Sequence, residues 1–434
     1  MWKSFKYKNT YYLLHMSSLS LFKINKKFFE QLKSNNKSAL QKLKKTDLQL
    51  QKKYDERHSE QLTSHITSIA LNVTQTCNLA CKYCYANEGT YNRPSTMSFK
   101  TAKNVINYFI NYSKPKKFII SFFGGEPLLN LKLIKKIFSY IKTIPQIKFN
   151  FKITTNAVML NKTTLKYLIN NNFYINVSFD GKGIHDYFRI DKNKTGTEHL
   201  VIQKLNLIKE LMQNPKKYSI RMTINKTHLN QLYDAILDLL YNYDCNIYLS
   251  LNHNNQDKNQ RFEKKDILKY LKILEKCCWH CIQNKDYKYV LKLANIQNTI
   301  NAIHLGLLNS TFCGAGINYI GVTSNGNFYL CHRCSENPNF YVGNPKDGLQ
   351  IQTLKKFLSY RQSKPKKCQN CYINHICGGG CFMDNYCYTH SELHPHPNAC
   401  LYHKKEFELA LKLYLTLKDL APNLFKKLNL LTKE

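Results

Sequence analysis

Acidic residues and long apolar runs are scarce in this sequence. Its 434 residues include 28 Asp and Glu against 64 Lys and Arg, which gives a formal net charge of +36. No run approaches the roughly 20 apolar residues that a membrane-spanning helix needs. Lys, Asn, His and Ser interrupt the N-terminus too often for a signal peptide. These absences predict a cytoplasmic protein that does not enter a membrane. Its length of 434 residues predicts about two to four domains.

The excess of basic residues is a feature that nucleic-acid-binding proteins share. Here the lysines are spread along the chain, and no basic-aromatic module accompanies them. We therefore do not expect a nucleic-acid partner, and an acidic peptide is the partner that this charge favours. Sixteen cysteines without an export signal indicate metal or redox chemistry rather than a disulfide framework.

Short apolar runs alternate with amphipathic stretches between residues 66 and 255, which indicates parallel βα units. The six predicted strands are 66–73, 117–123, 147–154, 173–179, 218–224 and 246–251. Six units are fewer than the eight of a full barrel, so the pattern predicts an α/β fold with a partial (βα)6 TIM-like barrel. Sites in such folds lie at the carboxyl ends of the strands.

Four further regions flank this predicted barrel. Residues 1–65 are basic, and they predict a hairpin at 10–25 followed by a Lys-rich helix through Tyr54. Residues 256–310 predict a helical connection. Residues 311–402 are rich in Gly, Asn and Cys and predict a domain that needs metal to hold its fold. Residues 403–434 predict a tail that carries most of a helix at about 402–419.

Three cysteines lie close together in "CNLACKYC" (77–84), directly after the first predicted strand. Three thiolates on one loop suit an Fe–S cluster with one open position, and a zinc-site fragment or buried cysteines are the alternatives. "FFGGEP" (122–127), "TTNA" (154–157) and "VSFDG" (177–181) lie at the ends of the next three strands. All four motifs are therefore expected at one edge of the sheet.

These motifs resemble the radical S-adenosylmethionine (SAM) superfamily, whose signature is Cys-x3-Cys-x-aromatic-Cys. The resemblance implies that Cys77, Cys81 and Cys84 hold a 4Fe–4S cluster whose free iron binds SAM. Cleavage of SAM would then give a 5′-deoxyadenosyl radical. The implied cofactor-binding residues are Tyr83, Gly124, Gly125, Glu126, Asn156, Ser178, Asp180 and Arg189. For Arg189, a surface ion pair is the alternative, and no catalytic residue is assigned beyond the cluster and SAM.

The C-terminal cysteines resemble the SPASM extension, which carries two auxiliary 4Fe–4S clusters behind many radical SAM cores. The resemblance implies that the distal cluster is held by Cys368, Cys371, Cys377 and Cys400. It assigns the nearer cluster to Cys313, Cys331 and Cys381, with Cys334 or Cys387 available as a fourth ligand. Structural zinc is the alternative. Cys245, Cys277, Cys278 and Cys281 match no motif, and for the last three, in "CCWHC" on a helix, burial in the core is expected rather than ligation.

Together the two resemblances predict a radical SAM/SPASM peptide maturase that installs a thioether crosslink in a ribosomally made peptide. Its expected partners are a precursor peptide, whose leader would add a strand to the N-terminal region, and an electron donor such as ferredoxin or flavodoxin. Anaerobic sulfatase maturases have an Asp where this chain has His332. Formylglycine formation on a protein is therefore the second hypothesis, and a non-catalytic metal-stabilised binding protein is the third.

Overall fold

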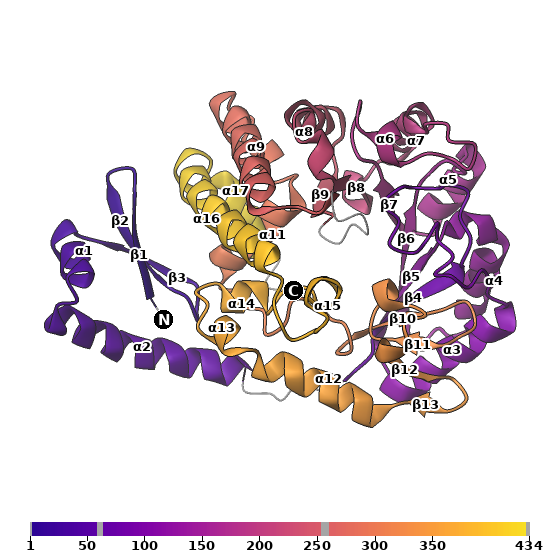
Figure 1. The fold of residues 1–434 in the computed structure, drawn as a ribbon, viewed down its shortest axis with the longest axis horizontal. Coiled ribbons are helices and arrows are strands. Elements are labelled where there is room, and N and C mark those ends of the chain that lie inside the picture. The colour runs from indigo at the N-terminus through magenta and orange to yellow at the C-terminus, as the bar shows by residue number, and fades with distance from the viewer. Residues whose placement is uncertain (1, 59–63, 253–259, 431–434) are drawn as a thin grey trace. The chain divides into compact units, whose positions relative to one another are not determined.

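The structure is a computed structural model that describes residues 2–58, 64–252 and 260–430. It divides the chain into two units (Figure 1). The first unit comprises Met1–Leu62, Cys278–Cys313 and Arg361–Glu434, and the second comprises Thr63–Cys277 and Gly314–Tyr360. The domain limits expected from the sequence stay a prediction, and residues 256–259 of the expected helical connection lie outside the described residues.

Six parallel strands form the centre of the second unit. They are β4 (Ser68–Thr74), β5 (Lys117–Gly124), β6 (Lys148–Thr155), β7 (Tyr174–Ser178), β8 (Tyr218–Ile224) and β9 (Asn246–Leu251). Each strand pairs with the next one in the chain, and each begins and ends within two residues of its predicted limits. The predicted α/β fold with a partial barrel of six units is therefore confirmed.

Helices connect these strands and cover one face of the sheet. The main ones are α3 (Phe99–Ser113), α4 (Leu131–Ile141), α5 (Lys162–Asn170), α7 (Glu198–Leu211) and α8 (Leu232–Asn242), with the short α6 (His185–Phe188) between β7 and α7. Figure 1 shows the strands following a curve, with these helices on its outer side. The chain passes from the second unit into the first within α9 (Lys264–Gln283).

Side chains alternate between the two faces of this sheet, as the pleat of a strand requires. On the helix side, Phe151 of β6 packs against Phe138 of α4, with ring centres 5.2 Å apart. The opposite, inner face carries Ser121, Lys152 and Arg221. Ser121 of β5 pairs with Lys152 of β6, and Arg221 of β8 pairs with Ser178 of β7. Full TIM barrels fill their interior with bulky branched side chains. The inner face here carries mostly polar side chains instead.

Four short strands extend the same sheet beyond β4. They are β10 (Tyr319–Val322), β11 (Phe328–Tyr329), β12 (Tyr341–Asn344) and β13 (Gly348–Leu349). β10 runs parallel to β4, and the others follow in antiparallel order. The sequence did not predict these strands, because two of them have only two residues. It also did not predict α12 (Ile351–Ser363), a 13-residue helix within the cysteine-rich region.

The first unit begins with an antiparallel sheet of three strands, β1 (Trp2–Tyr7), β2 (Thr10–His15) and β3 (Ser20–Ile24). β2 and β3 form the predicted hairpin, while β1 was not predicted because lysines interrupt its apolar pattern. Two helices follow, α1 (Lys26–Lys33) and α2 (Lys37–His58). The expected single helix is divided at Asn35, which has a positive φ of 54°.

The rest of the first unit is helical. It contains α10 (Tyr287–Val290), α11 (Ala294–Leu305), α13 (Lys366–Gln369), α14 (Asn374–Cys377), α15 (Phe382–Thr389), α16 (Pro397–Leu420) and α17 (Asn423–Leu430). α16 is the predicted C-terminal helix, but it begins five residues earlier, so it includes Cys400. Among the described residues, no helix has the length and apolar content needed to cross a membrane.

Candidate functional site

The cysteine triplet lies on the loop that follows β4. Backbone hydrogen bonds fix this loop to the end of α6 and the residues that follow it: Ala80 N donates to Ile190 O at 2.9 Å, and Lys82 N donates to Phe188 O at 3.0 Å. Within the triplet, Cys84 N donates to Cys81 O at 3.0 Å. All three cysteines are half-buried. The loop therefore holds three thiols at the carboxyl edge of the sheet, where the sequence predicted them.

The two glycines at the end of β5, Gly124 and Gly125, permit a close approach of backbones. Gly125 N donates to Thr74 O at 2.9 Å, and a Cβ added at Gly125 would lie 2.0 Å from Thr76 O. Gly89 was missed in the sequence, yet a Cβ there would lie 2.5 Å from Gly125 Cα and 3.0 Å from Cys77 Cβ. Its φ of +80° also favours glycine. These contacts bring the cysteine loop and the Gly-Gly-Glu turn together.

Glu126 is almost fully buried, with 1% of its surface exposed. Its Oε1 accepts hydrogen bonds from Leu128 N at 3.0 Å and Thr155 Oγ1 at 2.7 Å, and its Oε2 accepts from Asn156 N at 2.7 Å. Burial raises the pKa of Glu126 to about 7, although these three donors oppose the shift. Thr155, at the end of β6, is a further residue that the sequence did not single out.

Two more predicted residues lie at the ends of the following strands. Asn156 donates from Nδ2 to Asn78 Oδ1 at 2.9 Å, and the same nitrogen is 3.7 Å from Cys77 Sγ. Asn156 is thereby brought directly to the cysteine loop. Ser178 is the half-buried last residue of β7, in register with Arg221 of β8.

Asp180 and Arg189 form a buried ion pair beside the triplet. Arg189 Nε donates to Asp180 Oδ2 at 3.0 Å, and Tyr83 OH donates to the same oxygen. Thr223 N donates to Asp180 Oδ1 at 2.9 Å. The Arg189 guanidinium also lies 5.3 Å from the centre of the Tyr83 ring. Arg189 is thus not a surface ion pair, because Asp180 is 0% and Arg189 8% exposed.

The environment of the triplet favours a metal partner. Burial raises the pKa of Cys77 to about 12, with smaller contributions from Glu126, Cys81 and Cys84. Burial likewise raises the pKa of Cys81 to about 11. Thiolates buried in this way are costly without a cation, and iron would reverse the cost because metal coordination deprotonates a thiol. The donor set therefore fits an Fe–S cluster.

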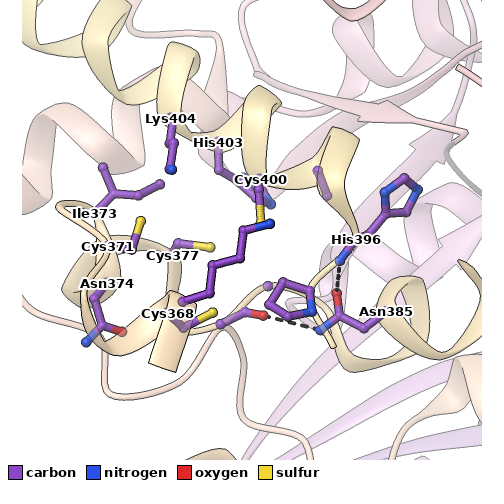
Figure 2. A pocket seen from close by; sticks show the side chains of 15 residues that line it. Cys368, Cys371, Ile373, Asn374, Cys377, Asn385, His396, Cys400, His403 and Lys404 are labelled. Carbon is purple, nitrogen blue, oxygen red and sulfur yellow. Dashed lines mark hydrogen bonds between the residues drawn. The ribbon is translucent and has the colours of Figure 1, made fainter. Parts of the chain in front are cut away.

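Four cysteines of the first unit line one pocket (Figure 2). Cys368 lies on α13, Cys371 follows it, Cys377 ends α14 and Cys400 lies in α16. Burial and then the neighbouring thiols raise the pKa of Cys368 to about 11 and that of Cys377 to about 12. A Cβ added at Gly379, which also lines the pocket, would meet no atom within 4 Å. This pocket has the four thiols and the open space that a second cluster requires.

Cys331 and Cys334 lie on one tight turn of the second unit. Their sulfur atoms are 3.8 Å apart, and Cys334 Sγ donates to Cys331 O at 3.1 Å. Between them, His332 Nδ1 forms a hydrogen bond of 2.6 Å with Tyr319 OH. The centre of the His332 ring is 4.4 Å from that of Phe123. Burial, followed by Arg333 and Arg221, lowers the pKa of His332 to about 3. His332 is therefore neutral at pH 7.

The other candidate ligands differ in exposure. In the first unit, Cys313 is exposed and its carbonyl accepts from Arg361 Nη2 at 2.9 Å, while Cys381 is half-buried at the start of α15. Cys387 is exposed on α15. The structure buries the cysteines that matched no motif, namely Cys245, Cys277, Cys278 and Cys281. In the described parts of the chain, no three Cys, His, Asp or Glu side chains converge closely enough for a single metal ion.

Comparison with curated proteins identifies several relatives. The chain is 24% identical over 335 residues to the radical SAM cyclopropyl synthase TigE of Paramaledivibacter caminithermalis, covering 73% of this chain and 68% of the relative. It is 40% identical over 126 residues to an uncharacterized protein of Methanocaldococcus jannaschii, and 28% identical over 168 residues to a cysteine-type anaerobic sulfatase-maturating enzyme of Clostridium novyi. Those two matches span 29% and 36% of this chain, and less than half of the relatives, 42% and 44%.

Solved structures share the fold. Native anSMEcpe with bound AdoMet matches with a TM-score of 0.67 at 21% identity, covering 81% of this chain and 99% of that one. Streptococcus suis SuiB bound to S-adenosylmethionine matches with a TM-score of 0.55 at 14% identity, covering 89% and 96%. The sequence family described as the Radical SAM superfamily matches residues 71–214, which contain the triplet and the following three motifs. The chain therefore contains a radical SAM domain over residues 71–214, within a fold that it shares with anSMEcpe and SuiB.

Proposed function

We propose that this enzyme is a peptide maturase that links a cysteine sulfur to a carbon atom within a ribosomally made peptide. The observation that carries the proposal is the turn at Cys331 and Cys334, where the residue that follows Cys331 is the half-buried His332. In anaerobic sulfatase maturases, an Asp that serves as a base occupies the position of His332. A thioether needs no such base if metal binding has already deprotonated the substrate thiol.

The proposed cofactors are SAM and three 4Fe–4S clusters. The core cluster is assigned to Cys77, Cys81 and Cys84, and the distal auxiliary cluster to the four cysteines of Figure 2. When bound, these groups remove one hydrogen atom and one further electron from the substrate. The surrounding chain positions them and limits access of water.

The protein residues at the sheet edge have separate tasks in this proposal. Asp180 is neutralised by Arg189 and orients Tyr83, the aromatic residue of the signature. Glu126 has only uncharged donors around it, so it is the carboxylate that can receive the ammonium group of SAM. Asn156 connects this carboxylate to the cysteine loop through its backbone N–H and its amide.

The proposed reaction conserves atoms and electrons. One C–H and one S–H bond break, one C–S bond forms, and two hydrogens leave: one as an atom taken by the SAM-derived radical, and one as a proton, with its electron accepted by an oxidised auxiliary cluster. Mass spectrometry of a Cys-containing precursor encoded beside the gene should show a loss of about 2 Da per crosslink, because each crosslink removes two hydrogens. The crosslinked cysteines should resist alkylation, and the Cys81→Ala variant should leave the peptide unchanged. A product whose thiols all still react would contradict the proposal.

The N-terminal sheet is the proposed site for the leader of the precursor. Its order β1-β2-β3 leaves β1 and β3 at the edges. β1 is engaged by α16, since Lys3 Nζ lies 2.8 Å from Glu408 Oε1 and Tyr7 OH lies 2.5 Å from Thr416 Oγ1. β3 instead exposes Phe22, so an extended leader can add to it as a fourth strand. Phe22→Asp should weaken precursor binding without changing SAM cleavage in the absence of peptide.

A sulfatase-type maturase is the second candidate. It is favoured by the relative from Clostridium novyi, which is named a cysteine-type anaerobic sulfatase-maturating enzyme, and by the fold of anSMEcpe. SuiB, by contrast, has been solved with the precursor peptide SuiA bound. Conversion of a cysteine to formylglycine in a sulfatase-derived peptide would select this second candidate. In either case, we propose a cytoplasmic enzyme that receives electrons from a ferredoxin or flavodoxin, whose acidic surface would complement the net charge of +36.

A further inference from the structure

One cation of the N-terminal sheet lies against the loop that carries a candidate cluster ligand. Lys3 belongs to β1, and its Nζ lies 3.9 Å from the centre of the Tyr372 ring. Tyr372 directly follows Cys371, and the residues on either side of it, Cys371 and Ile373, line the pocket of Figure 2. All four residues belong to the first unit. The N-terminal sheet therefore contacts the segment assigned to the distal cluster.

A carboxylate of α16 joins the same two side chains. Glu408 Oε1 accepts hydrogen bonds from Lys3 Nζ at 2.8 Å and from Tyr372 OH at 2.9 Å. Glu408 Oε2 accepts from Lys405 Nζ at 2.9 Å. Burial alone would raise the pKa of Glu408, but hydrogen bonds from these three donors lower it to about 2. The carboxylate is therefore ionised at neutral pH, and it holds the Tyr372 hydroxyl with a charge-assisted hydrogen bond.

The ring of Tyr372 is held as well as its hydroxyl. Phe407 of α16 packs against it edge-on, with ring centres 6.4 Å apart. Lys404, which lines the pocket, has its Nζ 5.7 Å from the centre of the same ring. An isolated surface ion pair would contribute little. Here the ion pair of Lys3 and Glu408 also fixes an aromatic residue next to a thiol.

The turn that carries Cys371 is short, so the position of Tyr372 bears directly on the thiol. Cys371 N donates to Cys368 O at 3.0 Å, and Asn374 N donates to Cys371 O at 2.9 Å. The reduction potential of an Fe–S cluster depends on its net charge, on hydrogen bonds and on solvent exposure. Both the charge of Lys3 and the placement of Tyr372 therefore affect a cluster held by this turn.

We propose that Lys3 is a positioning residue for the distal auxiliary cluster. Together with Glu408 it holds Tyr372, and it thereby fixes the turn of Cys371 and raises the reduction potential of the cluster. This inference rests on the cofactor set of the proposed function. It goes beyond that function, because it makes the N-terminal sheet, the proposed leader site, part of the surroundings of a redox centre.

The test isolates the distal cluster in the full-length chain. A background variant with Cys81→Ala and Cys331→Ser removes a ligand from each of the other two clusters, and both changes lie in the second unit. This background should hold about four iron atoms per chain. An anaerobic redox titration followed by low-temperature EPR gives the midpoint potential of the remaining cluster. The EPR line shape reports the geometry of its ligands.

In this background, Lys3→Met should lower the equilibrium constant for reduction about threefold, which is roughly 30 mV for a one-electron couple. Reduction adds a negative charge to the cluster, and the cation of Lys3 stabilises that charge. The EPR line shape should change as well, and Lys3→Arg should restore both properties. Tyr372→Phe keeps the ring but loses the hydrogen bond to Glu408, so it should also change the line shape.

Lys405→Met is the matched control. Lys405 is an exposed cation that binds the same carboxylate, but it donates to Oε2, whereas Lys3 and Tyr372 share Oε1. Its replacement should leave the potential and the line shape unchanged.

Two results would overturn the inference. An unchanged potential and line shape in Lys3→Met and Tyr372→Phe would show that this contact does not affect the cluster, and Tyr372→Phe alone decides if Lys3→Met does not fold. An equal shift in Lys3→Met and Lys405→Met would show a diffuse positive field rather than a positioning contact. A background variant without iron would instead refute the distal cluster itself, and with it the cofactor set of the proposed function, so the two failures are distinguishable.

Discussion

Replacing Glu126 by glutamine removes the ionisable group buried at the carboxyl edge of the sheet. Its carboxyl has a pKa of about 7 in the folded protein, against an ordinary value of 4.5. Between pH 4.5 and about pH 7, Glu126 keeps its proton in the native state, whereas it has lost its proton in the unfolded chain. The free energy of unfolding of the wild type therefore falls as pH rises through this window, and the contribution of Glu126 is fully present only below pH 4.5.

The size of the effect follows from the shift. At about 1.4 kcal/mol per pKa unit, ionisation of buried Glu126 lowers the stability by about 2 to 3 kcal/mol between pH 5 and pH 8. Glutamine has nearly the same shape but cannot ionise, so Glu126→Gln avoids this loss. Relative to the wild type, the variant should gain about 2 to 3 kcal/mol of stability from pH 5 to pH 8. Any pH-independent cost of the amide group, which opposes the Asn156 N–H, cancels in this difference.

Urea unfolding of the cluster-loaded enzyme without SAM, at several pH values under anaerobic conditions, measures this difference. Glu210→Gln is the control, because Glu210 is exposed on α7. Its stability relative to the wild type should not change with pH. If the curves of Glu126→Gln and the wild type run parallel from pH 5 to pH 8, the carboxyl is not penalised by burial and the reasoning is wrong.

Other substitutions test the clusters. Cys81→Ala should abolish SAM cleavage and leave the auxiliary-cluster absorbance, and deoxyadenosine formation at the wild-type rate would contradict the core assignment. Gly125→Ala should prevent loading of the core cluster, since its Cβ would lie 2.0 Å from Thr76 O; a wild-type iron content in this variant would refute that steric argument. Cys331→Ser should lose one cluster, about four iron atoms, whereas Cys334→Ser should retain all three. Equal iron loss in both variants, measured with low-temperature EPR, would make Cys334 a ligand.

The strands of the barrel could be predicted because short apolar runs mark where each strand begins and ends, and alternating residues mark its two faces. The run "NIYLSL" (246–251) coincides with β9 and alternates half-buried and buried residues over its first five positions. The order of parallel strands then placed four motifs at one edge without any knowledge of contacts. β1 was missed since its sequence, "WKSFKY", has lysine at two of six positions, and its burial comes from packing onto distant parts of the chain.

Contacts between residues far apart in sequence could not be predicted. Gln75 is fully buried and accepts a hydrogen bond from Ser324 N at 3.0 Å, 249 residues away. Gly89 is required only because Gly125 lies against it. Neither residue belongs to a motif with a recognisable spacing. In both cases, the signal is steric or polar complementarity, which becomes visible only when the two loops are placed side by side.

The two buried carboxylates at the sheet edge differ in a way that decides which one can serve a cationic ligand. Asp180 already receives Arg189 and Tyr83, so a further positive charge would gain little attraction there. Glu126 is met only by neutral donors, and its pKa near 7 shows that its charge is unsatisfied. An ammonium group beside Glu126 would lower this pKa and recover the free energy lost by burial. Ligand binding and ionisation of Glu126 are therefore coupled: a bound cation favours the ionised carboxylate, and the ionised carboxylate binds the cation more tightly.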